Sequence, residues 1–85
     1  MNRSDMFLVI QDYMQQIIEG VRGQNIQESQ SMHDFGADSL EIVEVVSRST
    51  RQLALRVPRT ELARAKNIAD LLDIFEQVAA AKPAL

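Results

Sequence analysis

A serine that follows an aspartate and a glycine-containing loop is the residue best placed to do chemistry in this chain. Residues 34–40 read Asp-Phe-Gly-Ala-Asp-Ser-Leu, and residues 41–46 continue as Glu-Ile-Val-Glu-Val-Val, a run typical of a helix. Ser and Asp favour helix N-termini because their side-chain oxygens accept hydrogen bonds from backbone N–H groups that have no partner within the helix. We therefore expect Ser39 at the start of a helix with its hydroxyl near solvent, where another enzyme can modify it. An Asp-Ser pair can also be a helix cap and nothing more.

Hydrolytic chemistry at Ser39 would need a general base and an oriented nucleophile. The chain has one histidine, His33, which could hydrogen-bond near Ser39 but is better explained as a solvated loop residue. The G-x-S-x-G turn that presents a nucleophilic serine in many hydrolases is missing from the sequence, so a serine hydrolase is a poor candidate. The sequence has no cysteine, which excludes disulfides and thiolate metal sites, and a single histidine does not make a metal site. We expect no metal.

Size and composition predict one small domain over residues 1–85. The chain has 85 residues, of which 46% are hydrophobic and 25% charged, a balance typical of a globular protein. Its net charge of −3 argues against nucleic acid as a partner, because phosphate contacts need clustered Lys and Arg. No apolar run has the length of a membrane span, and the N-terminus lacks the layout of a signal peptide. We expect a cytoplasmic monomer with no membrane partner.

The spacing of apolar residues predicts an all-α fold, a small four-helix bundle with three longer helices, one short helix and a long loop between the first two. The first helix is predicted over about residues 4–20, with Ser4 as its cap and Gly20 and Gly23 at its exit. Its buried face should hold Phe7, Ile10, Met14, Ile17 and Val21. Residues 22–38 are polar and are predicted as a surface loop with room for one helical turn, anchored by Ile26, Met32 and Phe35.

The second helix is predicted over residues 39–55 and should bury one stripe of side chains. That stripe holds Val43, Val46, Thr50 and Leu53, with Ile42 and Val45 beside it. The outer face then holds Leu40, Glu41, Glu44, Ser47, Arg48 and Arg51, and Glu44 and Arg48 have the spacing of a weak ion pair.

The last third of the chain predicts two more helices. A short helix follows Pro58, and Leu55, Val57 and Leu62 should face inward around it. A longer helix begins near Asn67, its expected cap, with Asp70 in the first turn. Its apolar stripe contains Ile68, Leu71, Leu72, Phe75, Val78 and Ala79. Residues 82–85 are predicted to be a flexible tail.

The segment from residue 34 to residue 44, D-F-G-A-D-S-L-E-I-V-E, resembles the phosphopantetheine attachment motif of acyl carrier proteins, usually written D-L-G-x-D-S-L. The match includes the glycine, Asp38 before the serine and Leu40 after it, while Phe35 replaces a leucine as a conservative apolar change. The resemblance implies that a phosphopantetheinyl transferase esterifies Ser39 with phosphopantetheine from coenzyme A. The thiol of that arm would carry acyl groups as thioesters, so the resemblance implies a carrier and not an enzyme.

The same resemblance implies a docking surface. Partner enzymes of such carriers contact the outer face of the helix after the serine, usually through acidic side chains and the leucine, and Leu40, Glu41 and Glu44 match that pattern. Arg48 belongs to this face but departs from the pattern, as do the residues at 49–51, which favours a specialised pathway over fatty-acid synthesis. The implied partners are acyltransferases, ketosynthases or hydroxymethylglutaryl-CoA (HMG-CoA)-synthase-like enzymes, and an acidic carrier suits basic docking surfaces.

A second resemblance covers residues 57–68, V-P-R-T-E-L-A-R-A-K-N-I. This stretch is similar to P-R-x-E-L-A-x-A-K-N-I in free-standing carriers of polyketide β-branching cassettes, which bring acetyl groups to an HMG-CoA-synthase-like enzyme. The other interpretation is an ordinary helix–loop–helix connection. The resemblance implies an acyl carrier of polyketide, and hence antibiotic, biosynthesis that acts as an acetyl donor.

Other functions remain open at this point. Within the carrier class, the alternatives are a fatty-acid carrier and a peptidyl carrier. A different class is a small helical interaction module with no prosthetic group. That module would share the fold, so only modification of Ser39 distinguishes it from a carrier.

Overall fold

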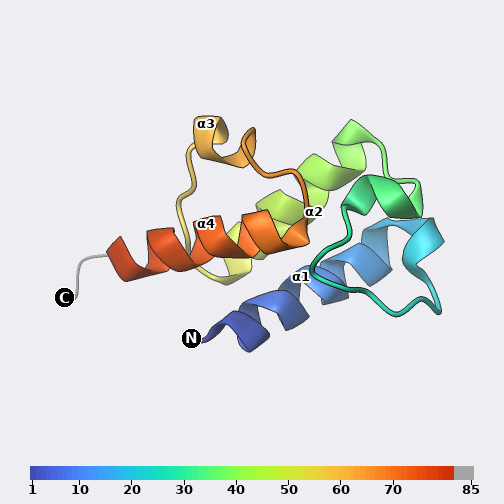
Figure 1. The fold of residues 1–85 in the computed structure, drawn as a ribbon, viewed down its shortest axis with the longest axis horizontal. Helices are drawn as coiled ribbons and strands as arrows, with labels where there is room; N and C mark the ends of the chain where they lie inside the picture. Colours follow the sequence, from blue (N-terminus) through green and yellow to red (C-terminus); the bar gives the residue numbers. More distant parts are fainter. Residues whose placement is uncertain (82–85) are drawn as a thin grey trace.

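The computed structural model describes residues 1–81, which form helices and no strand (Figure 1). The α-helices are α1 (Arg3–Ile17), α2 (Ser39–Gln52), α3 (Arg59–Leu62) and α4 (Ile68–Ala81). Two 3₁₀ helices, η1 (Glu19–Val21) and η2 (Met32–Phe35), lie in the connection between α1 and α2. The predicted all-α bundle of three longer helices and one short helix is confirmed. The predicted tail at residues 82–85 lies outside the described residues.

One hydrophobic core joins the three longer helices, and α1 packs against both α2 and α4. From α1 the fully buried side chains are Met6, Ile10 and Met14, while the predicted core residues Phe7 and Ile17 are only half-buried. The helices α2 and α4 and the loops complete this core with Val21, Ile26, Met32, Val45, Leu53, Ile68, Leu71, Leu72 and Phe75. No helix within residues 1–81 is long and apolar enough to cross a membrane.

The start of α1 corrects one prediction. Its cap is Asn2, whose side-chain oxygen accepts the backbone N–H of Asp5 at 2.9 Å, and not Ser4, which lies inside the helix. Both residue types cap helices well, so the sequence allowed either. The helix begins at Arg3, which places Asn2 at the cap position.

The rotation of α2 differs from the predicted one. The buried residues are Val45, Val46 and Ser49, whereas Val43, predicted to be in the core, is 65% exposed. The buried positions of α2 follow the helical spacing of three and four residues, but one of them is the polar Ser49. A prediction based on apolar side chains alone does not include this residue. The Ser49 hydroxyl is fully buried and has no hydrogen-bond partner among residues 1–81.

The end of α2 comes at Gln52 and not at Leu55, because the chain reverses in a left-handed residue. Ala54 has φ of 55°, and its N–H donates to the Arg51 carbonyl at 3.2 Å. The N–H of Leu55 donates to the Thr50 carbonyl at 2.9 Å. These two bonds form a Schellman motif, which usually has glycine at the left-handed position.

The loop between α1 and α2 is bonded to the start of α4. The N–H groups of Ile68 and Ala69 donate to the carbonyls of Gln30 and Glu28 at 3.0 and 2.8 Å. These bonds satisfy donors of the first helical turn, which have no partner inside α4. The loop therefore has a fixed path, and its predicted anchors Ile26 and Met32 are buried while Phe35 is half-buried.

Arg3 joins three segments that are far apart in the sequence. Its guanidinium contacts the carboxylates of Glu28 at 2.7 Å and Asp73 at 2.8 Å, and it also pairs with Glu76. Hydrogen bonds to Glu28, Asp73 and Glu76 raise the pKa of Arg3 above its ordinary value. The N-terminus of α1, the loop and α4 are thus held together at one end of the bundle.

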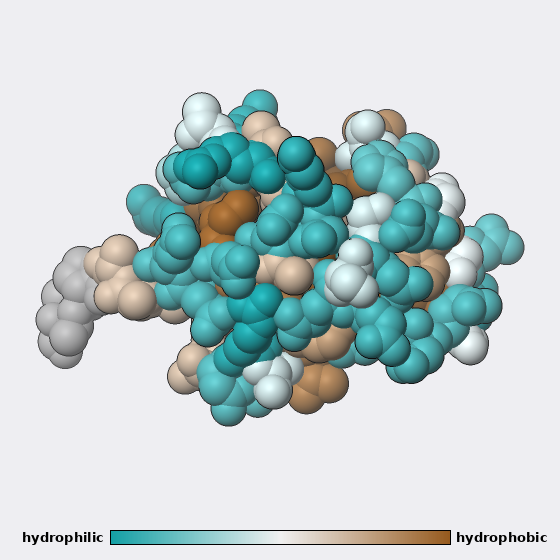
Figure 2. Space-filling model, viewed as in Figure 1, coloured by the Kyte–Doolittle hydropathy of each residue, from teal (hydrophilic) through white to brown (hydrophobic). Residues whose placement is uncertain are grey.

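The start of α4 agrees with the sequence. Asn67 caps the helix by accepting the N–H of Asp70 at 2.8 Å, and the Asp70 carboxylate accepts the N–H of Lys66 at 2.9 Å. Pro58 directly precedes α3, as predicted for the short helix. The helix α3 lies above α4 in the view of Figure 1, and apolar side chains are visible between the two in Figure 2.

Candidate functional site

Ser39 is the first residue of α2 and is exposed to solvent. The cap before it is Asp38, whose carboxylate accepts the N–H of Glu41 at 2.8 Å. The Glu41 carboxylate in turn accepts the N–H of Asp38 at 3.0 Å, which completes a capping box. Because Asp38 and Glu41 make the cap, the Ser39 hydroxyl has no structural task, and it forms no hydrogen bond within residues 1–81.

The loop that precedes Ser39 is fixed by local hydrogen bonds. The 3₁₀ helix η2 has its own capping box, in which Ser31 and Asp34 exchange bonds of 2.8 and 3.3 Å. Gly36 ends η2 with φ of +83°, a left-handed conformation that glycine adopts without strain. The motif glycine therefore serves to turn the chain toward Asp38.

His33 is exposed, as expected for a loop histidine, and it has a structural contact. Its Nδ1 donates to the carbonyl oxygen of Ala37 at 3.2 Å, one residue before Asp38. Because Nδ1 faces a carbonyl acceptor, it cannot accept a proton from Ser39 in this arrangement. His33 thus holds the backbone of the motif.

The outer face of α2 carries two exposed apolar side chains three residues apart, Leu40 at 81% and Val43 at 65%. Leu40 was predicted to be outside. Val43 was not, because its apolar character suggested the core. The predicted docking carboxylates have partners already, since Glu41 closes the cap and Glu44 pairs with Arg48 at 2.7 Å. The sequence-predicted ion pair between Glu44 and Arg48 is confirmed.

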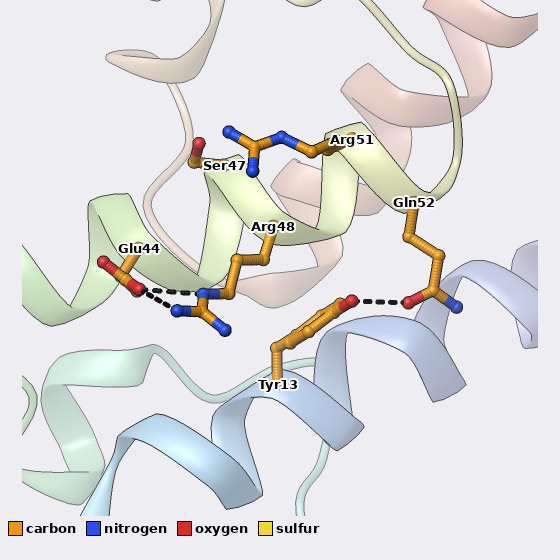
Figure 3. Close-up of a pocket in the computed structure, with 6 residues that line it drawn as sticks. All are labelled: Tyr13, Glu44, Ser47, Arg48, Arg51 and Gln52. Carbon is orange, nitrogen blue, oxygen red and sulfur yellow. Dashed lines mark hydrogen bonds and ion pairs between the residues drawn. The ribbon is translucent and has the colours of Figure 1, made fainter.

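Arg48 lies over a polar hollow between α2 and α1, drawn in Figure 3. Tyr13 from α1 donates its hydroxyl to the side-chain oxygen of Gln52 at 2.6 Å across this hollow. Ser47 and Arg51 complete the lining. Within residues 1–81, its lining side chains all carry polar groups and none of them has a buried polar atom without a partner, so the hollow is a polar seam between two helices.

A second groove, about 750 Å³ in volume, lies between α2 and α3 with α4 below. It begins one turn after Ser39 along α2. Its apolar walls come from four segments and include Ile42, Val46, Val57, Leu62, Ile68 and Leu71. The sequence did not predict this groove, because its lining combines residues from η2, α2, α3, α4 and the segments on either side of α3, which come together only in the fold.

The chain is similar in sequence to known proteins. The family model described as the phosphopantetheine attachment site matches residues 10–75, so the chain belongs to that family. A polyketide biosynthesis acyl-carrier-protein, AcpK, of Bacillus subtilis (strain 168) is 26% identical over 75 residues, 88% of this chain and 92% of that protein. An acyl carrier protein of Campylobacter curvus (strain 525.92) is 35% identical over 51 residues, 60% of this chain and 66% of that protein.

A solved structure is similar in both fold and sequence. It is the crystal structure of the HMG synthase of the curacin biosynthetic pathway in complex with an acetyl donor acyl carrier protein. One of its chains matches with a TM-score of 0.80 and 30% identity, over 93% of this chain and 99% of that chain. The predicted resemblance to acyl carrier proteins is confirmed. The chain is a carrier and not an enzyme, and its prosthetic group is phosphopantetheine.

The residues at the start of α2 fit this group. Within residues 1–81, the N–H groups of Ser39 and Leu40 have no hydrogen-bond partner, because the cap uses those of Asp38 and Glu41. Free N–H groups in a first helical turn favour an anion such as a phosphodiester. An exposed hydroxyl beside them is a suitable attachment point.

Proposed function

We propose that Ser39 carries the phosphopantetheine arm and that the chain presents acyl groups to enzymes of polyketide biosynthesis. The thiol of the arm supplies the chemistry, because it holds the acyl group as a thioester. The proposal rests on one observation at the start of α2, where the residues that cap the helix are different from the exposed serine. Asp38 and Glu41 form the cap, and Ser39 is left exposed with an unengaged hydroxyl.

The protein's part is to hold the serine in a fixed, accessible position. The capping boxes at residues 31–34 and 38–41 and the contact between His33 and Ala37 fix the backbone on the N-terminal side of Ser39. The N–H groups of Ser39 and Leu40 belong to the first turn of α2, next to the Ser39 hydroxyl, and this favours the negative charge of a phosphodiester attached there. The groove between α2 and α3 is one turn away and can shelter the apolar part of an acyl chain.

The docking face is proposed to include Leu40, Glu41, Glu44 and Arg48, as the sequence predicts, together with Val43. Leu40 and Val43 are the exposed apolar side chains nearest to Ser39 on α2 and are suited to a partner's apolar pocket. The ion pair between Glu44 and Arg48 reduces the negative charge of this face. A small contact of this kind allows the carrier to leave each enzyme after each step.

The partners we propose are a phosphopantetheinyl transferase and an HMG-CoA-synthase-like enzyme that accepts the acetyl group for β-branching. Acyltransferases and ketosynthases are the other candidate partners. The similarity to the acetyl donor carrier in the curacin structure supports this narrower role. So does the stretch at residues 57–68, which contains α3 and the Asn67 cap of α4.

The test uses acetyl-loaded protein and the curacin-pathway HMG synthase as the acceptor enzyme. We expect acetyl transfer from this carrier to be faster than from an acetyl-loaded fatty-acid carrier, and the double variant Leu40→Ser/Val43→Ser to slow it. A matched control is Leu8→Ser, which removes an exposed apolar side chain of α1. Equal rates for the two carriers would contradict the β-branching role and leave the carrier role intact.

A further inference from the structure

The charge of the chain changes sign within α2. Residues 34–47, which contain the motif and the first half of the helix, carry acidic side chains and no Lys or Arg. Residues 48–66 carry most of the chain's nine Lys and Arg residues and a single acid, Glu61. These cations are Arg48, Arg51, Arg56, Arg59, Arg64 and Lys66. Because the protein as a whole has a net charge of −3, the basic segment is a local feature and does not follow from the composition.

Two of these cations, Arg48 and Arg51, lie together on the exposed side of α2. They are three residues apart, a spacing that makes side chains neighbours on a helix, and both line the hollow between α2 and α1. Figure 3 shows Arg51 extending along α2 toward Ser47, while Arg48 reaches toward Glu44 and Tyr13 lies on the α1 side. Both arginines are exposed, so a group from another molecule can reach them.

The guanidinium groups of these two arginines have donors to spare. Among residues 1–81, Arg51 forms no ion pair. Arg48 donates from Nε to Oε1 of Glu44 at 2.8 Å and places Nη2 at 2.7 Å from the same oxygen, which leaves Nη1 without a partner in that part of the chain. A carboxylate from outside can therefore bind both arginines while the pair with Glu44 stays in place.

Helix stability alone does not account for the basic segment. Arg51 lies in the last turn of α2, where a cation interacts favourably with the helix dipole. Arg56 and Arg59 lie beyond the end of α2 and have no such role in that helix. The same two residues also form no ion pair within the described chain, so the fold leaves their charge unbalanced.

We propose that Arg48 and Arg51, together with the α1 side of the hollow, bind an acidic patch on a partner enzyme, while the acids around Ser39 face a basic patch. The inference rests on the proposed function, since the partner is the enzyme that receives the acyl group from the arm. Guanidinium groups suit this contact because they bind carboxylates through several N–H donors.

The mixed sign of this face determines how the carrier lies on the enzyme. Arg51 comes twelve residues after Ser39, which corresponds to about 18 Å along a helix. Two patches of opposite sign at that separation favour one orientation of the carrier and disfavour the reverse. An enzyme whose docking surface is basic throughout is repelled at the Arg51 end, so the same cations act against it.

The first experiment tests acid binding without the arm. The 15N-labelled protein is titrated with hexaglutamate, and amide NMR signals report where the peptide binds. We expect the largest shifts at residues 47–52 and at Tyr13, and binding about two- to tenfold weaker in Arg48→Gln/Arg51→Gln, the effect of two exposed ion pairs. The matched control Arg22→Gln removes an exposed cation that does not line the hollow and should bind as the wild type does.

Parallel titrations separate an acidic protein from other anions. The probes are a single-stranded hexathymidylate and inorganic phosphate. Tighter binding of either probe at residues 47–52 would overturn an acidic protein surface as the occupant. Hexaglutamate shifts centred on residues 56–66, or an equal loss of binding in Arg22→Gln, would also overturn the inference.

The second experiment uses the acetyl-loaded protein and the curacin-pathway HMG synthase. Arg48→Glu/Arg51→Glu should raise KM by about tenfold and leave kcat unchanged, because the two residues are far from Ser39 and act on association. Arg48→Lys/Arg51→Lys keeps the charge and should keep most of the wild-type KM, and Arg22→Glu is the matched control. Urea unfolding verifies that each variant is folded.

The inference and the proposed function fail separately. A KM that is unchanged or lowered by the charge reversal, with normal acetyl transfer, would overturn the inference alone. A protein that takes no arm on Ser39 would overturn the proposed function and, with it, the assignment of the partner.

Discussion

The carboxylate of Asp38 and the carboxylate of Glu41 each accept the other residue's backbone N–H, at 2.8 and 3.0 Å. This reciprocal pair caps α2 at the residue directly before Ser39. It explains why the motif has an acid ahead of the serine. A serine that had to cap the helix itself would have its hydroxyl engaged with the backbone, whereas Asp38 leaves the Ser39 hydroxyl available.

Removal of the Asp38 side chain should therefore affect stability and modification together. We expect Asp38→Ala to lower the free energy of unfolding by about 1 kcal/mol, the usual loss for a helix cap. The rate of arm attachment should fall because the first turn of α2 frays. Urea unfolding measures the first effect and transferase kinetics the second.

The matched control for Asp38→Ala is Ser31→Ala, which removes the cap of η2 in the same loop. It should lower stability but slow attachment less, since the first turn of α2 keeps its own capping box. If Ser31→Ala slows attachment as much as Asp38→Ala does, the capping box at Ser39 has no special role in presenting the hydroxyl.

The buried hydroxyl of Ser49 gives a stabilising prediction. An unpaired hydroxyl costs free energy when it is buried, so Ser49→Ala should raise the free energy of unfolding by about 1 kcal/mol. Part of this gain is the better helix propensity of alanine. The control Ser47→Ala changes an exposed serine of the same helix and isolates that part. A gain no larger than the control's would show that Ser49 has a partner in solution.

The left-handed residue at the end of α2, Ala54, gives a second prediction of increased stability. Ala54→Gly should stabilise the protein by about 1 kcal/mol, because the φ of 55° strains an L-residue and suits glycine. Ala80→Gly, at an exposed position in the last turn of α4, should give no such gain, because glycine lowers helix propensity. Thermal and urea unfolding compare the two. A destabilised Ala54→Gly would contradict the Schellman geometry.

The close approach of η1 to η2 makes Gly20 sensitive to any side chain. A Cβ at position 20 would collide with the backbone carbonyl of Phe35, just before the motif glycine. Gly20→Ala should cost about 1–3 kcal/mol, in the range for overpacking, and should shift the amide NMR signals of residues 34–38. Gly23→Asn is the control, since that position has φ of +75° with open space around it and asparagine tolerates such φ values. Unchanged signals in Gly20→Ala would contradict the contact.

The features that the sequence predicted are local ones. The start of α2 at residues 38–39 and the Asn67 cap are short motifs whose hydrogen bonds join residues three apart. The helices were predictable for a similar reason, because apolar residues at spacings of three and four mark a buried face.

The features that the sequence did not predict depend on distant contacts or on exceptions to pattern. The rotation of α2 was wrong because a serine is buried at position 49 and a valine exposed at position 43. The contacts of Arg3 with Asp73 and Glu76 join residues about 70 positions apart. Gly20 was read as a helix end, whereas the fold uses it to let Phe35 approach.

The Ser39 hydroxyl is the proposed attachment point of the arm. Purified protein is incubated with coenzyme A, magnesium and a promiscuous phosphopantetheinyl transferase, and the modified peptide is located by mass spectrometry. We expect a mass increase of one arm on the peptide that contains Ser39, retained in Ser47→Ala and lost in Ser39→Ala. An unmodified wild-type protein, or an arm that still attaches in Ser39→Ala, would contradict it.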